Sequence, residues 1–267
     1  MAGARAALAA LTVAAAAAVF FLPRISQDAA YHDFADQKTL LSIPNCLNVV
    51  SNLPFAVVGI MGLVFLFGRN GSSFISRKER WPFVVFFLGV ALTSAGSSYY
   101  HLAPSNERLV WDRLPMTLGF MSVFAAVIEE RVSPKLGRWL LAPLLMLGLA
   151  SVLYWHVTES AGAGDLRLYA IVQFYPLLAI PLMLALFPPL YTRGADLVGA
   201  LAVYGLAKLL ELMDRAIFSA GEIISGHSLK HLAAAAAAFL ILRALKRREP
   251  ISSPAGNARA VAAGRKS

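Results

Sequence analysis

Residues 82–102 read PFVVFFLGVALTSAGSSYYHL, an apolar run that ends in a group of polar side chains. A run of about 20 residues is what an α-helix needs to cross ~30 Å of hydrocarbon at ~1.5 Å per residue. Inside lipid, the backbone groups must be hydrogen-bonded within their own segment, so such a run forms a helix. The stretch therefore predicts a transmembrane helix that brings polar residues to one face of a membrane.

The same pattern recurs along the whole chain. Of its 267 residues, 58% are hydrophobic and only 15% are charged, and the mean hydropathy is +0.64. A soluble domain carries about a quarter charged residues. Runs long enough to span a membrane occur at seven places: 46–67, 82–102, 110–128, 138–157, 168–187, 195–212 and 227–245. The predicted fold class is all-α, a multi-pass transmembrane bundle of seven helices.

An eighth apolar run, about 6–22, lies at the N-terminus, where it is either an extra helix or a signal segment. No small-x-small cleavage site follows it before Arg24, which favours an extra helix. We therefore divide the chain into four parts. These are the apolar segment 1–23, a non-cytoplasmic acidic segment 24–45, the seven-helix domain 46–247 and a disordered basic tail 248–267.

The distribution of positive charge predicts the orientation. If residues 24–45 are outside and the seven spans alternate, sixteen Lys and Arg residues lie inside and seven outside. Such an excess is typical of cytoplasmic loops, so the C-terminus is predicted to be cytoplasmic. The net charge of +9 is explained in the same way, without a nucleic-acid partner. All four tryptophans (Trp81, Trp111, Trp139 and Trp155) fall at predicted span ends, as an aromatic belt requires.

Three histidines are candidate metal ligands. His227 and His231 are spaced i, i+4 and share one helix face, and His101 ends a span that reaches the same membrane face. Three protein ligands with one open position are typical of catalytic zinc. The alternative is a set of interfacial histidines that hydrogen-bond to lipid headgroups. The single cysteine, Cys46, excludes an intramolecular disulfide.

Two further residues fit the same layer of the membrane. Ser97 lies one helical turn before His101, and Asp112 follows across a short loop. A carboxylate beside zinc can take up a proton from water, and a hydroxyl can stabilise an oxyanion. The simpler interpretations are helix packing for Ser97 and a favourable charge near a helix N-terminus for Asp112.

The span at 195–212 and its exit carry four charged residues. We expect Lys208, Glu211 and Arg215 to share one helical stripe and to neutralise one another inside the bundle, next to Asp214. Two interpretations of this group are open, a structural role, which is favoured, and a role in lining a substrate site.

These motifs resemble the alkaline ceramidase family, part of a superfamily of seven-helix hydrolases that includes the adiponectin and progestin receptors. The resemblance rests on SSYYHLAPSNERLVWDRLPM (97–116), HSLKH (227–231) and PNCLNVVSNLPF (44–55), and it covers roughly residues 30–245. It implies a zinc-dependent amidase that cleaves a ceramide-like membrane lipid into a sphingoid base and a fatty acid. By this resemblance His101, His227 and His231 hold zinc, Asp112 handles the zinc water and Ser97 assists the oxyanion.

The resemblance also implies a calcium site before the first span. Its candidate ligands here are Asp33, Asp36 and Asn45, although Lys38 stands where another oxygen ligand is expected. Calcium takes six to eight oxygen ligands, more than this stretch offers, so a solvated acidic loop is the alternative.

Three other functions are compatible with the sequence to different degrees. A zinc-activated water attacks esters as well as amides, so a lipid ester hydrolase or acyl remodeller is the first alternative. A receptor-like membrane protein with a non-catalytic zinc is the second. A haem protein is disfavoured, because two histidines on one face of the same helix suit a small ion better than a porphyrin.

Overall fold

The computed structural model describes residues 2–68 and 74–251, and the described chain consists of helices joined by short loops. The helices are α1 (Ala2–Phe21), η1 (Ala29–His32), α2 (Cys46–Val50), α3 (Leu53–Phe67), η3 (Arg77–Arg80), α4 (Trp81–Leu102), α5 (Asn106–Arg131), α6 (Pro134–Ser160), α7 (Arg167–Leu186), α8 (Gly194–Leu212), α9 (Asp214–Ser219) and α10 (Gly226–Arg247). The all-α fold class is confirmed, and each predicted span coincides with a helix. The span at 46–67 is divided by a turn into α2 and α3.

Six of the described helical stretches are long and apolar enough to cross a membrane: α1, α2 with α3, α4 with η3, α6, α7 and α10. The chain is therefore an integral, multi-pass membrane protein. Helices α5 and α8 are of similar length but carry more charge. In α5 the charged residues Asp112, Arg113, Glu129 and Glu130 are buried, because this helix lies in the centre of the bundle.

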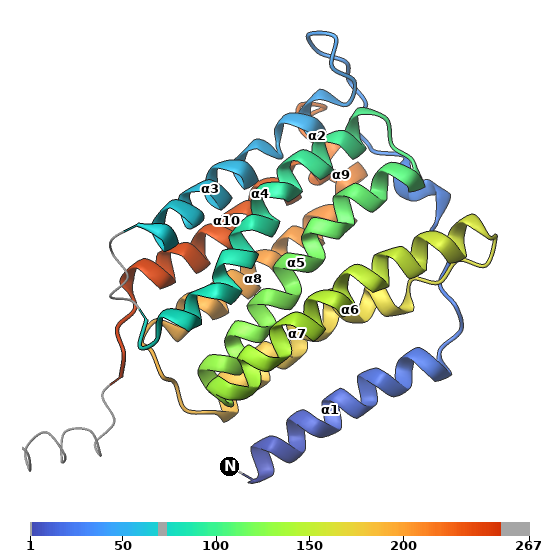
Figure 1. Ribbon diagram of the computed structural model, residues 1–267. Coiled ribbons are helices and arrows are strands. Elements are labelled where there is room, and N and C mark those ends of the chain that lie inside the picture. Colours follow the sequence, from blue (N-terminus) through green and yellow to red (C-terminus); the bar gives the residue numbers. More distant parts are fainter. Residues whose placement is uncertain (1, 69–73, 252–267) are drawn as a thin grey trace, which may run out of the picture.

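The helices pack as an elongated bundle (Figure 1). Helix α4 packs against α3 and α5, α5 packs against α6, and α10 packs against α8. Helix α1 lies apart from the others along α7, where the Thr12 and Tyr175 hydroxyl groups are hydrogen-bonded at 2.6 Å. No residue of α1 is buried, so this helix adds little to the core.

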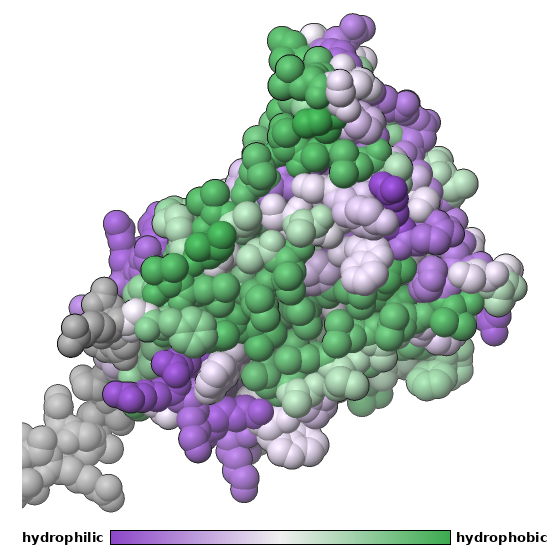
Figure 2. Space-filling model, turned by 45° about the horizontal axis from the view of Figure 1, so that its top comes forward, coloured by the Kyte–Doolittle hydropathy of each residue, from purple (hydrophilic) through white to green (hydrophobic). Residues whose placement is uncertain are grey.

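Hydrophobic side chains cover the flank of the bundle between two more hydrophilic ends, as Figure 2 shows. Three of the tryptophans, Trp81, Trp111 and Trp139, are exposed on the surface, as predicted for an aromatic belt. The prediction is wrong for Trp155, which is fully buried. Its ring lies against the Arg113 guanidinium, 4.2 Å from ring centroid to carbon, and thus belongs to the core.

The chain beyond α10 is ordered at its beginning, in contrast to the predicted tail. The backbone N–H of Ile251 donates to Leu190, and that of Thr192 donates to Glu249, each at 2.9 Å. These bonds hold residues 248–251 against the loop between α7 and α8. The remainder of the predicted tail, 252–267, lies outside the described residues.

Candidate active site

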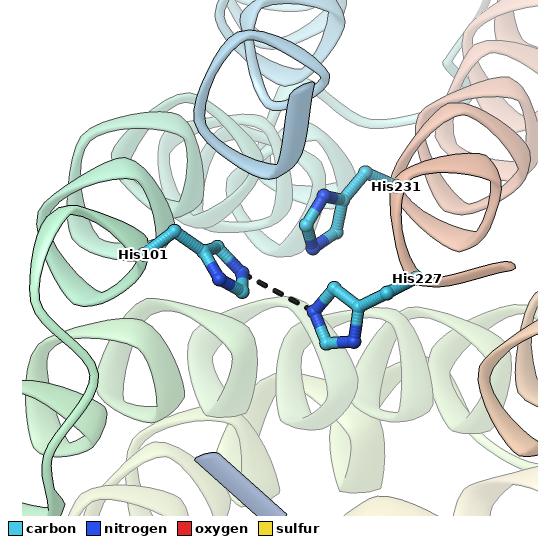
Figure 3. A group of neighbouring side chains, drawn as sticks. All are labelled: His101, His227 and His231. Carbon is cyan, nitrogen blue, oxygen red and sulfur yellow. Dashed lines mark hydrogen bonds between the residues drawn. The ribbon is translucent and has the colours of Figure 1, made fainter. Parts of the chain in front are cut away.

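Three histidines converge at one end of the bundle (Figure 3). His101 comes from the last turn of α4, while His227 and His231 come from the first turns of α10. All three are buried, and one ligand atom of each lies within 4.8 Å of the others. The described residues contain no second such cluster of His, Cys, Asp or Glu. The predicted convergence of these histidines on one face is thus present in the structure.

The geometry of the triad fits a small divalent ion. The Nε2 atoms of His101 and His227 are 3.3 Å apart. Two nitrogens bound to one tetrahedral zinc at about 2.1 Å would stand roughly 3.4 Å apart, close to this distance. A donor set of three imidazole nitrogens is the kind found at catalytic zinc, which takes its fourth ligand from water or substrate.

Two structural features place the histidines of α10. Ser225 caps the helix by accepting a bond from the Ser228 N–H at 3.2 Å, so that the helix begins just before the HxxxH pair. At Gly226 a Cβ atom would lie 2.2 Å from the Leu210 carbonyl oxygen. Glycine is therefore required for α10 to approach α8 this closely.

The triad is oriented by side chains from the segment around α2. The Ser51 hydroxyl is hydrogen-bonded to His231 Nδ1 at 2.8 Å and donates to the Asn48 carbonyl at 3.2 Å. This contact leaves His231 Nε2 for a metal. The Asn45 amide donates to the His101 carbonyl at 2.9 Å, which fixes the end of α4.

An aromatic side chain from the N-terminal segment covers the triad. The Phe34 ring lies 4.7 Å from the His101 ring and 4.4 Å from the His227 ring, centroid to centroid. Asp214 holds the cover in place, because its carboxylate accepts both the Ala35 N–H at 2.9 Å and the His227 N–H at 2.7 Å. The N-terminal segment thereby covers the rings of His101 and His227.

Ser97 and Asp112 face each other across the contact between α4 and α5. Both are buried, and their side chains are close enough to interact. The close approach depends on Gly96, where a Cβ atom would stand 2.0 Å from the Trp111 carbonyl oxygen. A larger residue at Gly96 would push the Asp112 backbone away from Ser97.

The two residues line a cavity of about 490 Å³ that His231 also lines. Most of its wall is apolar and comes from α5, α7, α8 and α10. Tyr31 lines the cavity from η1, and burial raises the pKa of its phenol. A cavity of this size and character is suited to an apolar ligand with one reactive polar group.

The charged residues of α8 are arranged differently from the prediction. Glu211 forms ion pairs with both Lys208 and Lys230, the second of which comes from α10. Arg215 belongs to α9 and pairs with Asp33 instead. The expected stripe of 208, 211 and 215 is thus wrong at Arg215, because the chain turns at Met213 between α8 and α9.

The calcium prediction finds no support in the geometry. Asp33 is paired with Arg215, and the Asn45 amide is bonded to His101. Asp36 is buried and accepts the Lys38 N–H at 3.1 Å. Among the described residues, the three side chains do not form a cluster of oxygen ligands.

Several residues at the site were not anticipated from the sequence. These are Ser51, Asn48 and Phe34, which contact α10 from segments far away in the sequence. The only signal in the sequence is the group of polar residues within an apolar stretch at 48–52. His32 and His156 stay outside the cluster. His32 is bonded instead to the Tyr100 hydroxyl at 2.8 Å and to Asn106 at 3.0 Å.

A membrane bundle that buries three convergent histidines beside a carboxylate and an apolar cavity defines a membrane-embedded hydrolase with a metal site. The family model named Ceramidase matches residues 37–186, more than half of the chain, and the protein belongs to the ceramidase family. Members of this family hydrolyse the amide bond of ceramide. The match includes Ser97, His101 and Asp112 but ends before α8, and the fold brings the histidines of α10 to it. A comparison with curated proteins found no significant match.

Proposed function

We propose that the protein is a zinc-dependent amidase that hydrolyses the N-acyl amide of ceramide-like lipids within the bilayer. The observation that carries the proposal is the position of the buried triad, His101, His227 and His231, beside the apolar cavity. Zinc fits the donor set, and a zinc ion held there would polarise an amide carbonyl and lower the pKa of a water ligand to about 7.

The side chains around the triad have the chemistry that amide hydrolysis requires. Asp112 accepts the proton of the attacking water and delivers it to the leaving amine, as the C–N bond breaks and the new C–O bond forms. The Ser97 hydroxyl donates a hydrogen bond to the oxygen that becomes negatively charged. Phe34 limits access of bulk water from the aqueous side, which strengthens these electrostatic effects.

The cavity supports a lipid as the substrate. Its walls are lined by residues such as Phe120, Val127, Ile180 and Ile241, which extend from the triad towards the opposite end of the bundle. An acyl chain in this cavity places its amide at Asp112 and Ser97. Basic residues gather where α4 begins and α10 ends, a full helix length from the triad. This distribution supports a cytoplasmic C-terminus and an active site towards the other face.

The proposal is tested by metal analysis and a ceramide hydrolysis assay on the purified protein. We expect about one zinc per chain, and we expect Asp112→Asn to reduce turnover by ~10²–10⁴-fold while the zinc is retained. A protein without zinc, or an Asp112→Asn variant with undiminished turnover, would contradict the assignment. Phospholipids are assayed in parallel, because cleavage of their ester bonds would indicate a lipid ester hydrolase instead of an amidase.

A further inference from the structure

The end of the cavity next to the triad carries an excess of positive charge. Its charged lining residues are three cations, Arg113, Lys208 and Lys230, and two carboxylates, Asp112 and Glu211. Glu211 lies between the two lysines. Among the described residues, neither Asp112 nor Arg113 forms a salt bridge within 4.0 Å.

Arg113 is held rigidly but is not neutralised. Its side chain donates to Gln27 at 2.7 Å, and its guanidinium lies over the rings of Trp155 at 4.2 Å and Tyr169 at 4.7 Å. The residue is only 5% exposed, yet its Nη1 atom has no hydrogen-bond partner in the described chain. A guanidinium fixed in this way, with a free donor, is suited to bind a carboxylate.

The two lysines also retain hydrogen-bonding capacity. Each ammonium group has three donors, and both share the single carboxylate of Glu211. The Lys208 side chain is 31% exposed and lines the cavity. In surroundings of low dielectric constant, an uncompensated cation is costly, and a bound anion removes that cost.

We infer that Arg113, Lys208 and Lys230 form a subsite for the carboxylate of a single-chain acyl lipid whose chain occupies the apolar part of the cavity. The inference rests on the proposed function, because the same cavity serves both. The carboxylate has two sources that share this chemistry. It belongs either to the fatty acid released by hydrolysis or to an N-acyl amino acid used as substrate.

The test measures binding rather than turnover, in protein stripped of metal by a chelator, so that the subsite can be judged even if the zinc assignment fails. Palmitate and N-palmitoylglycine carry a carboxylate, whereas N-palmitoylethanolamine is a neutral analogue with the same acyl chain. Each ligand displaces a fluorescent acyl probe from the protein in a neutral detergent. We expect the carboxylates to bind about tenfold more tightly, as a hydrogen bond to a charged group predicts.

Variants assign the preference to the subsite. We expect Lys208→Gln and Arg113→Gln each to remove most of the preference and Lys208→Arg to keep it. The control Lys246→Gln, an exposed residue near the other end of α10, is expected to change nothing. Because Arg113 also joins α5 to its aromatic neighbours, Lys208→Gln is the decisive variant if Arg113→Gln fails to fold.

The outcomes are distinct. A preference for palmitate alone supports the subsite and identifies the product as its ligand, whereas a preference that includes N-palmitoylglycine supports it and identifies an acidic substrate. Equal binding of the charged and neutral ligands overturns the inference. A preference that persists in both Lys208→Gln and folded Arg113→Gln also overturns it, because the carboxylate then binds elsewhere.

Discussion

Polar side chains are buried at both ends of the helix bundle, but their partners differ. At the end where α4 begins and α10 stops, Glu130 forms an ion pair with Arg248, and the Tyr191 hydroxyl donates to Glu79. The Arg248 guanidinium also lies 4.0 Å from the centroid of the Tyr191 ring. At the opposite end, three histidines face one another, and Asp112 lacks an ion-pair partner within 4.0 Å among the described residues.

In the first group, both carboxylates have partners among the described residues, because Glu130 pairs with Arg248 and Glu79 accepts from Tyr191. Burial and the bond to Glu79 raise the pKa of Tyr191, whose phenol is the donor in that bond. Such a closed cluster stabilises a fold without needing a ligand. The triad and the residues beside it leave donors and acceptors that a metal and a substrate would satisfy, which is typical of a functional site.

The largest effect is expected from His231→Ala, which removes a ligand at the open end. Loss of a residue that only supports a metal ligand costs about 10–100-fold, so loss of the ligand itself is expected to reduce ceramide hydrolysis by more than about 100-fold. Because the change also leaves the buried Ser51 hydroxyl without its imidazole partner, hydrolysis is compared per folded chain. His156→Ala is the control, since His156 lies outside the triad. Full activity in His231→Ala would contradict the assignment of the triad end as the functional end of the bundle.

Glu130→Gln tests the closed end. It removes the charge of Glu130 from its buried ion pair with Arg248, and breaking such a pair costs about 3 kcal/mol. We expect a lower thermal midpoint in detergent and an unchanged zinc content per folded chain. The exposed Glu249→Gln serves as control. If Glu130→Gln instead lost zinc or turnover at full stability, this cluster would have a functional role.

The two ends were also predictable to different degrees. Helices and the convergence of His101 with His227 and His231 follow from apolar run lengths and i, i+4 spacing, which are local properties of the chain. The opposite cluster joins the loops before α4 and α8 to the end of α10. Such partners are set by packing between distant segments. The same holds for the contact of Ser51 with His231 and for the ion pair of Glu211, which forms with Lys230 and not with Arg215. Sequence spacing carries no information about them.

Ser51→Ala sharpens the account of the open end. Without the hydroxyl, His231 Nδ1 loses its bond and the imidazole ring loses its orientation, so zinc affinity should fall by about 10–100-fold. Competition with a zinc-binding dye measures the affinity directly. Ser98→Ala is a matched control, because Ser98 bonds to the Val49 carbonyl at 3.1 Å and does not contact the triad. Equal losses in both variants would assign the effect to packing of α2 on α4.

The smallest effect is expected at Asp165, a charged residue at the same end of the bundle as the triad but outside the cavity. The Asp165 carboxylate forms an ion pair with Arg167, as Glu130 does with Arg248 at the opposite end of the bundle. The Arg167 guanidinium donates to both carboxylate oxygens, at 2.8 and 2.7 Å, and lowers the pKa of Asp165 from 3.8 to about 2.

A carboxyl whose pKa is lower in the folded state stabilises the protein at any pH above its pKa in the unfolded state. This contribution disappears as the pH falls through the pKa in the folded state. Asp165→Asn should therefore cost about 1 kcal/mol at neutral pH, and the difference from the wild type should shrink below about pH 4 and vanish near pH 2. Thermal unfolding across this pH range measures it, with the exposed Glu222→Gln as control. A cost that stays constant down to pH 2 would show that Asp165 acts through its shape and neutral hydrogen bonds rather than through its charge.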